Sequence, residues 1–354
     1  LHRWRQQWAI RTGDKMENFV PYLIVALIQV AISLGIFGFV MVNALLLTLA
    51  ERKLLGWMHQ RLGPMEVGPW GLFQPFADMI KLLTKGDVIP KAADKFFYSY
   101  SALIAFTPSF ITFAFIPFGL VGGIKLVAAD TEIGVLMISA VMALSVIGII
   151  LGGWSSGNKF SLLGAVRTAA QEISYEIPKT LAIIAVVMLA GSMNVYHISS
   201  IQRVWFIAPQ FIGFLVFFVS SLAEIFRIPF DLAEGESELV AGYNVEFSGI
   251  RFAFFFFAEY TYLFVTSAVI TALYLGGGSG PEFLPWGLSS LFWFLLKSFA
   301  MVGFILWFSR SLPRVRADQL MNMAWKIMLP LSLVNIIWTA FIVLNENLLK
   351  IVVK

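Results

Sequence analysis

The residues best suited to chemistry in this chain are carboxylates that lie within or beside strongly apolar sequence. Glu172 and Glu176 are four residues apart in one apolar stretch, Glu224 lies near the end of the next, and Glu259 lies among phenylalanines inside a third. Further acids follow Glu224 closely, namely Asp231, Glu234, Glu236, Glu238 and Glu246. A charge kept beside hydrocarbon is energetically costly and usually has a function. These acids are therefore the first candidates for a functional site.

Glu172 and Glu176 would share one helix face, because residues four apart in a helix lie above one another. Two carboxylates this close, in a medium of low dielectric constant, cannot both ionise cheaply. Such a pair can take up and release a proton, which is what a proton relay requires. The alternative is that Arg167 and its neighbours form a helix extension in water. If the acidic regions converge inside a helical bundle, they would form a hydrated chain of carboxylates.

The elements that must position these acids are transmembrane helices. The chain has 354 residues, 59% of them hydrophobic and 13% charged, and its 34 phenylalanines exceed what a soluble core buries. We expect an all-α polytopic membrane protein, with an amino-terminal tail at 1–19 and a single integral-membrane helical domain at 20–354. About eight runs are long enough to cross a bilayer. They lie near 20–50, 98–124, 133–153, 162–191, 205–226, 250–275, 289–308 and 320–344.

Two Gly-x-x-x-Gly patterns predict where these helices pack closely. They run from Gly119 to Gly123 and from Gly148 to Gly152. Small residues at this spacing let two helix backbones approach each other in a membrane. The pattern is common, so it predicts close packing and no particular function.

Residue types that hold redox centres are scarce. The chain has no cysteine and only three histidines, which are widely separated at His2, His59 and His197. It therefore offers no thiolate to an iron–sulfur cluster and no evident haem or zinc ligand set. No glycine-rich nucleotide-binding motif is present. We expect this chain to hold no metal, haem, flavin or iron–sulfur cluster, so any redox centre would belong to a partner.

The polar loop at 51–97 is basic and contains several Gly-Pro turns. Lysine and arginine accumulate in short cytoplasmic loops, so this loop is predicted to be cytoplasmic and both termini to be periplasmic. The basic residues of the tail at 1–19 favour the opposite orientation, but the loop carries more of them. Within the loop, Asp78 and Lys81 would share one face of an amphipathic segment lying along the membrane surface.

Several long motifs resemble a known family. They are Ala50-Glu-Arg-Lys53, Arg61-x-Gly-Pro, Val67-Gly-Pro-x-Gly-Leu-x-Gln-Pro-Phe-Ala-Asp78, Ala169-Ala-Gln-Glu-Ile-Ser-Tyr-Glu176 and Pro229-Phe-Asp-Leu-Ala-Glu-Gly-Glu-Ser-Glu-Leu-Val240. In this order they resemble the quinone-site membrane subunit of respiratory complex I, often called the H subunit in bacteria. The similarity runs from the first apolar run to the last. One departure is Ala317, where the family commonly has tyrosine, and no role is carried over to it.

The resemblance implies an eight-span bundle whose cytoplasmic loops line a quinone tunnel. The residues implied at the tunnel and at the subunit junction are Glu51, Arg52, Arg61, Asp78, Lys81, Arg227 and Asp231. The acids implied in a proton path from the quinone to the pumping subunits are Glu172, Glu176, Glu224, Glu234, Glu236, Glu238 and Glu259. Quinone reduction consumes protons, and an isoprenoid tail needs an apolar channel that ends in polar groups. The acids could supply the protons, and the structured polar loop could provide the polar groups at the end of the channel.

The resemblance also implies partners and a location. The chain would be a multi-pass subunit of a proton-translocating NADH:quinone oxidoreductase in the inner membrane of a bacterium. Its partners would be the other membrane subunits of complex I and the hydrophilic iron–sulfur and quinone-site subunits of the peripheral arm. Its substrate would be ubiquinone or menaquinone, and we expect no contact with nucleic acid.

Two other functions stay open at this point. Buried carboxylates would equally serve a stand-alone proton-coupled transporter, which would be purified alone instead of with iron–sulfur partners. An energy-converting hydrogenase contains an equivalent membrane subunit, although the intact Gly-Glu-Ser-Glu motif at 235–238 favours the quinone enzyme. The sequence leaves open the quinone type, the choice of NADH or ferredoxin as electron donor, and which carboxylate changes protonation.

Overall fold

The chain is an almost entirely helical bundle, described by a computed structural model for residues 2–233 and 235–353, without the side chains of 2–26, 236, 237 and 286. The strands of the described part form one short hairpin, β1 (Leu120–Val121) paired antiparallel with β2 (Ile124–Lys125). An all-helical structure is what a bilayer requires, because a helix satisfies its own backbone hydrogen bonds. The expectation of an all-α membrane fold is confirmed.

Seven helical segments are long and apolar enough to span a membrane in the described part of the chain. They are α1 (His2–Met58), α3 (Lys95–Phe113), α4 (Gly134–Ala143) with α5 (Ser145–Ser155), α6 (Lys159–Ala190), α10 (Gly249–Tyr274), α11 (Leu288–Ser311), and α12 (Ala317–Met323) continued through η4 (Ala324–Met328) into α13 (Leu329–Leu344). The remaining expected span, 205–226, contains the shorter apolar helix α8 (Phe211–Glu224). At about 1.5 Å per residue, its 14 residues are shorter than the roughly 30 Å hydrocarbon layer.

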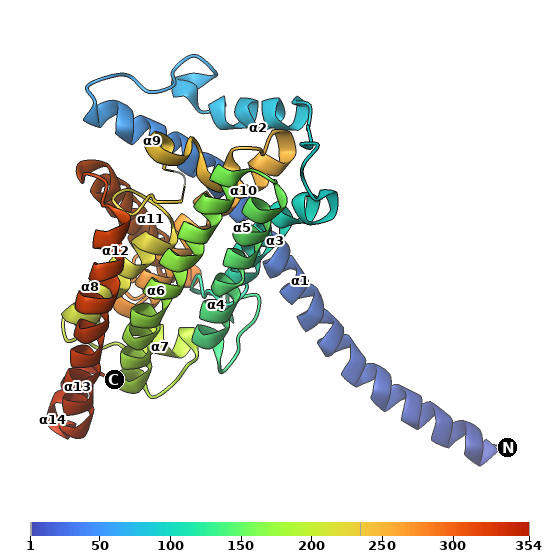
Figure 1. Cartoon of the computed structure of the whole chain (residues 1–354). Coiled ribbons are helices and arrows are strands. Elements are labelled where there is room, and N and C mark those ends of the chain that lie inside the picture. The colour runs from blue at the N-terminus through green and yellow to red at the C-terminus, as the bar shows by residue number, and fades with distance from the viewer. Residues whose placement is uncertain (1, 234, 354) are drawn as a thin grey trace.

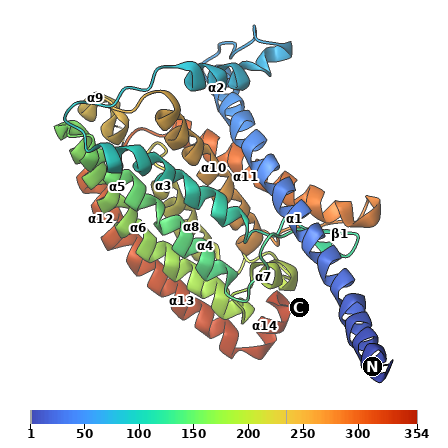
Figure 2. The same ribbon diagram turned by 90° about the vertical axis from the view of Figure 1, so that its right-hand side faces the viewer.

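Short elements cap the two ends of the bundle. They are η1 (Pro69–Gly71), α2 (Gln74–Thr84), α7 (Val195–Ile201), α9 (Glu236–Leu239), η2 (Gly242–Asn244), η3 (Pro285–Gly287) and α14 (Glu346–Val352). Figure 1 shows α2 and α9 at one end of the bundle, with α14 and the beginning of α1 at the opposite end. Figure 2 shows that the first half of α1 extends away from the other helices.

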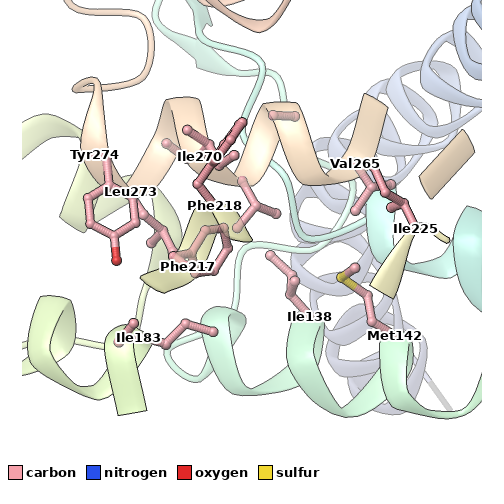
Figure 3. Close-up of a cluster of buried hydrophobic side chains, with 14 of the residues drawn as sticks. Ile138, Met142, Ile183, Phe217, Phe218, Ile225, Val265, Ile270, Leu273 and Tyr274 are labelled. Carbon is pink, nitrogen blue, oxygen red and sulfur yellow. The ribbon is translucent and has the colours of Figure 1, made fainter. Parts of the chain in front are cut away.

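Helix α10 is the centre of the bundle, since a larger share of its apolar window is buried than in any other described span. Val265, Ile270 and Leu273 of α10 belong to the main hydrophobic cluster together with Phe217 and Phe218 of α8. Figure 3 shows these side chains gathered between the helices, with residues of α4 and α6 opposite them. Because lipid is as apolar as the core, such helices are held together mainly by close packing and polar contacts.

One of the two glycine patterns lies between helices, and the other does not. A Cβ at Gly148 of α5 would lie 2.3 Å from the backbone nitrogen of Ala105 on α3, so these helices approach closely there. Gly119, Gly122 and Gly123 instead lie in and before the β1–β2 hairpin, where their positive φ angles suit glycine. The prediction of helix packing at 119–123 is therefore wrong, because the chain turns at that point.

Replacing Gly148 with alanine should destabilise the bundle. The new methyl group would collide with the Ala105 backbone, and such overpacking costs about 1–3 kcal/mol. Gly303→Ala on α11 is the matched control, because a Cβ there meets nothing within 4 Å. Thermal unfolding of the purified protein should show a lower midpoint for Gly148→Ala than for the control, and equal midpoints would contradict the close approach of α3 and α5.

Candidate functional site

Three predicted acids from three helices line one cavity inside the bundle. Glu172 comes from α6, Glu224 from the end of α8 and Glu259 from α10. The cavity has a volume of about 30 Å³, and since one water needs about 10–15 Å³, roughly two waters fit. Ser145 and Tyr262 also line it, so such waters would have several polar partners. The three acids could therefore exchange a proton through water.

The position of Glu224 depends on the early end of α8. The helix ends at Glu224, and Phe226 has a positive φ of 51°, so the chain leaves the helix inside the protein. Gln171 of α6 donates from Nε2 to the carbonyl oxygens of Ala223 and Phe230, at 2.6 and 2.9 Å. These bonds hold the end of α8 and the segment after it against α6. The short helix thus places a carboxylate beside the cavity.

Glu224 also forms a buried ion pair with Lys179 of α6. The two side chains are only 6% and 7% exposed, and the lysine Nζ donates to Oε2 of Glu224. Glu176 is partly buried on the same helix, three residues before Lys179. Buried charges at this depth require partners, because their desolvation is costly. The cavity is therefore joined to a cluster of charges between α6 and α8.

A second buried cluster lies around Glu51 of α1. Oε1 of Glu51 accepts a hydrogen bond from Nη1 of Arg227 at 2.7 Å and another from Nη2 of Arg310 on α11. The Glu51 side chain is 3% exposed. One carboxylate thus links α1, α11 and the segment that follows α8. Charge-assisted hydrogen bonds of this kind are stronger than neutral ones and fix the relative position of the three segments.

Arg227 and Tyr260 connect the two clusters. The Arg227 guanidinium lies 5.0 Å from the centre of the Tyr260 ring on α10, and the Tyr260 hydroxyl is within hydrogen-bonding reach of Glu51. Arg227 also interacts electrostatically with Glu259, which lines the cavity. Arg227 and Tyr260 therefore lie between the Glu51 cluster and the acids of the cavity.

A larger pocket opens between α2 and the beginning of α10. Its volume of about 350 Å³ falls in the range of about 300–1,000 Å³ that is typical of small-molecule sites. Arg52, Asp78 and Lys81 provide charge, and Phe252 and Phe256 provide an apolar wall. Arg52 donates from Nη1 to Oδ2 of Asp78 at 2.5 Å. A pocket with apolar walls and a few placed charges suits a flat ligand with polar edges.

A smaller pocket continues from this one toward the Glu51 cluster. It has a volume of about 20 Å³, and Arg52, Asp78, Leu82 and Phe256 line both pockets. Tyr260 lines its inner part. The surface pocket and the buried charges therefore meet at α1, α2 and α10.

Among the acids of the loop after α8 whose side chains the structure describes, none lines the cavity. Glu238 is exposed and accepts from Nη1 of Arg167 at 2.5 Å, and this hydrogen bond lowers the pKa of Glu238. Asp231 is half-buried, and Oε1 of Glu246 accepts from the Asn158 amide at 2.7 Å. Glu234 and the side chain of Glu236 lie outside the described part of the structure.

Arg61 is also exposed, in the loop before α2. The structure therefore brings together three of the predicted proton-path acids, and separately Glu51 with Arg227, and Arg52 with Asp78 and Lys81. It places Glu238 and Arg61 on the surface.

Several charged and polar residues of these clusters were not predicted from the sequence. Lys179 follows Glu176 by three residues on one helix face, so the pairing rule for helices would have selected it. Arg310 lies in the last turn of α11, just past the end of an expected span. Gln171 and Tyr260 carry no charge and gave no signal. Their roles arise from contacts between helices that are distant in the chain.

Comparison with known proteins shows the family. The model of the family described as NADH dehydrogenase matches residues 31–340. The H subunit of NADH-quinone oxidoreductase from Geobacillus thermodenitrificans (strain NG80-2) is 53% identical over 296 residues, which cover 83% of this chain and 88% of that protein. The chain belongs to the family of H subunits of NADH-quinone oxidoreductase. It is thus a membrane subunit of complex I, as the sequence motifs predicted.

Two further members of this family match with lower identity. The H subunit from Dehalococcoides mccartyi (strain CBDB1) is 46% identical over 329 residues, which cover 93% of this chain and 89% of that protein. The H subunit from Bacillus mycoides (strain KBAB4) is 49% identical over 296 residues, which cover 83% of this chain and 87% of that protein.

Among the residues that the structure describes, no group of three or more His, Cys, Asp or Glu side chains could hold a metal ion.

Proposed function

We propose that this subunit binds the quinone between α1, α2 and α10 and couples its reduction to proton movement through the buried acids. The single observation that carries the proposal is the cavity shared by Glu172, Glu224 and Glu259. Three acids from separate helices beside a space that admits water are the arrangement that proton transfer needs. Ionisable groups inside a membrane protein cost free energy, so they are usually kept because they have a function.

The pocket between α2 and α10 is the proposed site for the quinone headgroup. Phe252 and Phe256 offer apolar contact to the ring, whereas the Arg52–Asp78 pair can orient its oxygens. Reduction of a quinone places negative charge on those oxygens, and the reaction consumes two protons. The Glu51 cluster lies just inside this pocket. A change of charge at the quinone ring would therefore alter the electrostatic potential at Arg227, which interacts with Glu259.

The electrons for this reaction would come from iron–sulfur subunits that dock at the end of the bundle carrying α2. Several large apolar side chains there are exposed, among them Leu62 (80%), Trp70 (76%) and Val88 (69%). We propose that these exposed apolar side chains contact the partner subunits. We place this end on the cytoplasmic side of the bacterial inner membrane, because the 51–97 loop is basic, and both termini on the periplasmic side.

Glu259→Gln tests the proposed coupling. Glutamine keeps the shape of the side chain but cannot carry a proton, so proton pumping per NADH oxidised by the assembled complex should fall by about tenfold. Membrane vesicles with a pH-sensitive dye measure proton uptake, and NADH absorbance measures electron transfer. Glu282→Gln, in the exposed loop before α11, is the control. Normal pumping by assembled Glu259→Gln complex would contradict the proposal.

Asp78→Asn tests the quinone pocket separately. The change weakens the contact that orients Arg52, so the KM for a short-chain quinone should rise about tenfold, which corresponds to about 1.4 kcal/mol of lost binding. Asp318→Asn is a suitable control, because it alters an exposed pair with Arg316. An unchanged KM would place quinone binding elsewhere.

A further inference from the structure

Lys179 is a buried cation within the cluster of acids, and the proton path described so far does not use it. Its Nζ donates to Glu224 across the α6–α8 interface and lies 5.9 Å from the centre of the Phe217 ring. Attraction to both the aromatic ring and the carboxylate fixes the position of the ammonium group. The side chain is only 7% exposed, so bulk water does not screen the pair.

The surroundings of Lys179 contain more acids than cations. Glu172 and Glu176 lie on α6, Glu224 on α8, and Tyr262 of α10 faces Glu172 and Glu224. One ammonium can neutralise one carboxylate, and the direct contact selects Glu224. By contrast, Oε2 of Glu172 is fully buried and has no hydrogen-bond partner among the described residues. Glu172 and Glu224 therefore differ in their partners, although they line the same cavity.

We infer that Lys179 is a positioning residue that keeps Glu224 ionised, so that Glu224 accepts the proton that Glu172 releases through the cavity. In this step the O–H bond of the Glu172 carboxyl group breaks and an O–H bond forms on Glu224, with water relaying the proton. Glu172 becomes the carboxylate and Glu224 the carboxyl group, so the total charge is unchanged and no redox partner is needed. The inference rests on the proposed function, because it assumes that the cavity conducts protons.

The ion pair also makes the protonated state of Glu224 short-lived. Once Glu224 is protonated, the Lys179 ammonium loses its carboxylate and leaves an unpaired buried charge, which is costly. Glu176 lies three residues earlier on the same helix face and is the next acid within reach. Release of the proton from Glu224 restores the original pair. Lys179 thus keeps Glu224 available as a proton acceptor and promotes its return to the ionised state.

Lys179→Met tests this role, because methionine keeps the length of the side chain and removes the charge. In assembled complex, protons pumped per NADH oxidised should fall about tenfold, and Lys179→Arg should retain pumping. Lys297→Met is the matched control, since Lys297 is a buried lysine on α11 that donates to the carbonyls of Leu275, Gly277 and Ser279. Wild-type pumping by Lys179→Met, or an equal loss in Lys297→Met, would overturn the inference.

Glu224→Gln separates this inference from the proposed function. Normal pumping by Glu224→Gln would contradict the proton path itself, whereas low pumping by Glu224→Gln with normal pumping by Lys179→Met would contradict only the role of Lys179. If Lys179→Met does not assemble, Lys179→Met combined with Glu224→Gln removes both charges. Equal pumping by this double variant and Glu224→Gln alone supports the inference, because the lysine then acts only through Glu224. Lower pumping by the double variant would overturn it.

Discussion

Glu51→Gln should greatly reduce the amount of assembled and active complex. Glu51 is the buried carboxylate that binds both Arg227 and Arg310, so the substitution leaves two guanidinium groups without their shared charge partner. Removal of one partner from a buried ion pair costs about 3–5 kcal/mol, a large part of the stability of most proteins. The measurements are the level of the subunit in membranes, its unfolding midpoint and the rate of quinone reduction.

A double variant and a surface control identify the cause of that loss. Glu51→Gln combined with Arg310→Met removes one of the two cations that have lost this partner, so it should recover part of the stability. Glu346→Gln breaks an exposed pair with Lys350 and should cost less than about 1 kcal/mol. If Glu51→Gln were as stable and active as this control, the cluster would contribute neither to the joint of α1 and α11 nor to the quinone site.

Ala258→Val should stop proton pumping although every carboxylate is retained. Ala258 lines the cavity with Glu172, Glu224 and Glu259, and the added methyl groups would occupy much of its roughly 30 Å³. Without water between them, the acids cannot pass a proton, so pumping per NADH oxidised should fall by about tenfold or more. The assay is proton uptake by membrane vesicles that contain the assembled complex.

Two variants separate exclusion of water from simple overpacking. Ala258→Ser keeps the cavity small and polar and should retain pumping. Ala268→Val adds the same volume to a fully buried position of α10 outside the cavity lining, so it should lower stability by about 1–3 kcal/mol without uncoupling the enzyme. Loss of pumping in Ala268→Val to the same degree would show that packing, not hydration, determines the result.

The membrane architecture could be predicted from the sequence because hydropathy acts locally. Seven of the expected spans correspond to long helices, but the run 205–226 contains a helix of only 14 residues. Most of that shortening lies at the beginning, because α8 starts at Phe211 and not at 205. At the other end, hydropathy cannot reveal the end of the helix at Glu224, since Ile225 and Phe226 are as apolar as the helix that they follow. The bonds from Gln171 that stabilise the early end of α8 come from another helix. For the same reason, Gly119 and Gly123 matched a helix-packing pattern although they lie at a hairpin.

The candidate site could be predicted in its residue types but not in its pairs. Glu172, Glu224 and Glu259 were selected because acids are rare beside apolar sequence, and they line one cavity. Glu238 was selected by the same argument and is exposed, because a loop can turn its acids to water. The pairing of Glu51 with Arg227 and Arg310, and of Glu224 with Lys179, depends on the packing of helices far apart in the chain. Spacing along one helix cannot supply that information.

The most direct test of the central claim is to see whether the cavity contains water. A structure of the assembled complex that resolves ordered waters should show at least one between the carboxyl groups of Glu172, Glu224 and Glu259, since the cavity is polar and large enough for about two. A cavity closed by neighbouring side chains, with those carboxyl groups separated and dry, would contradict the account.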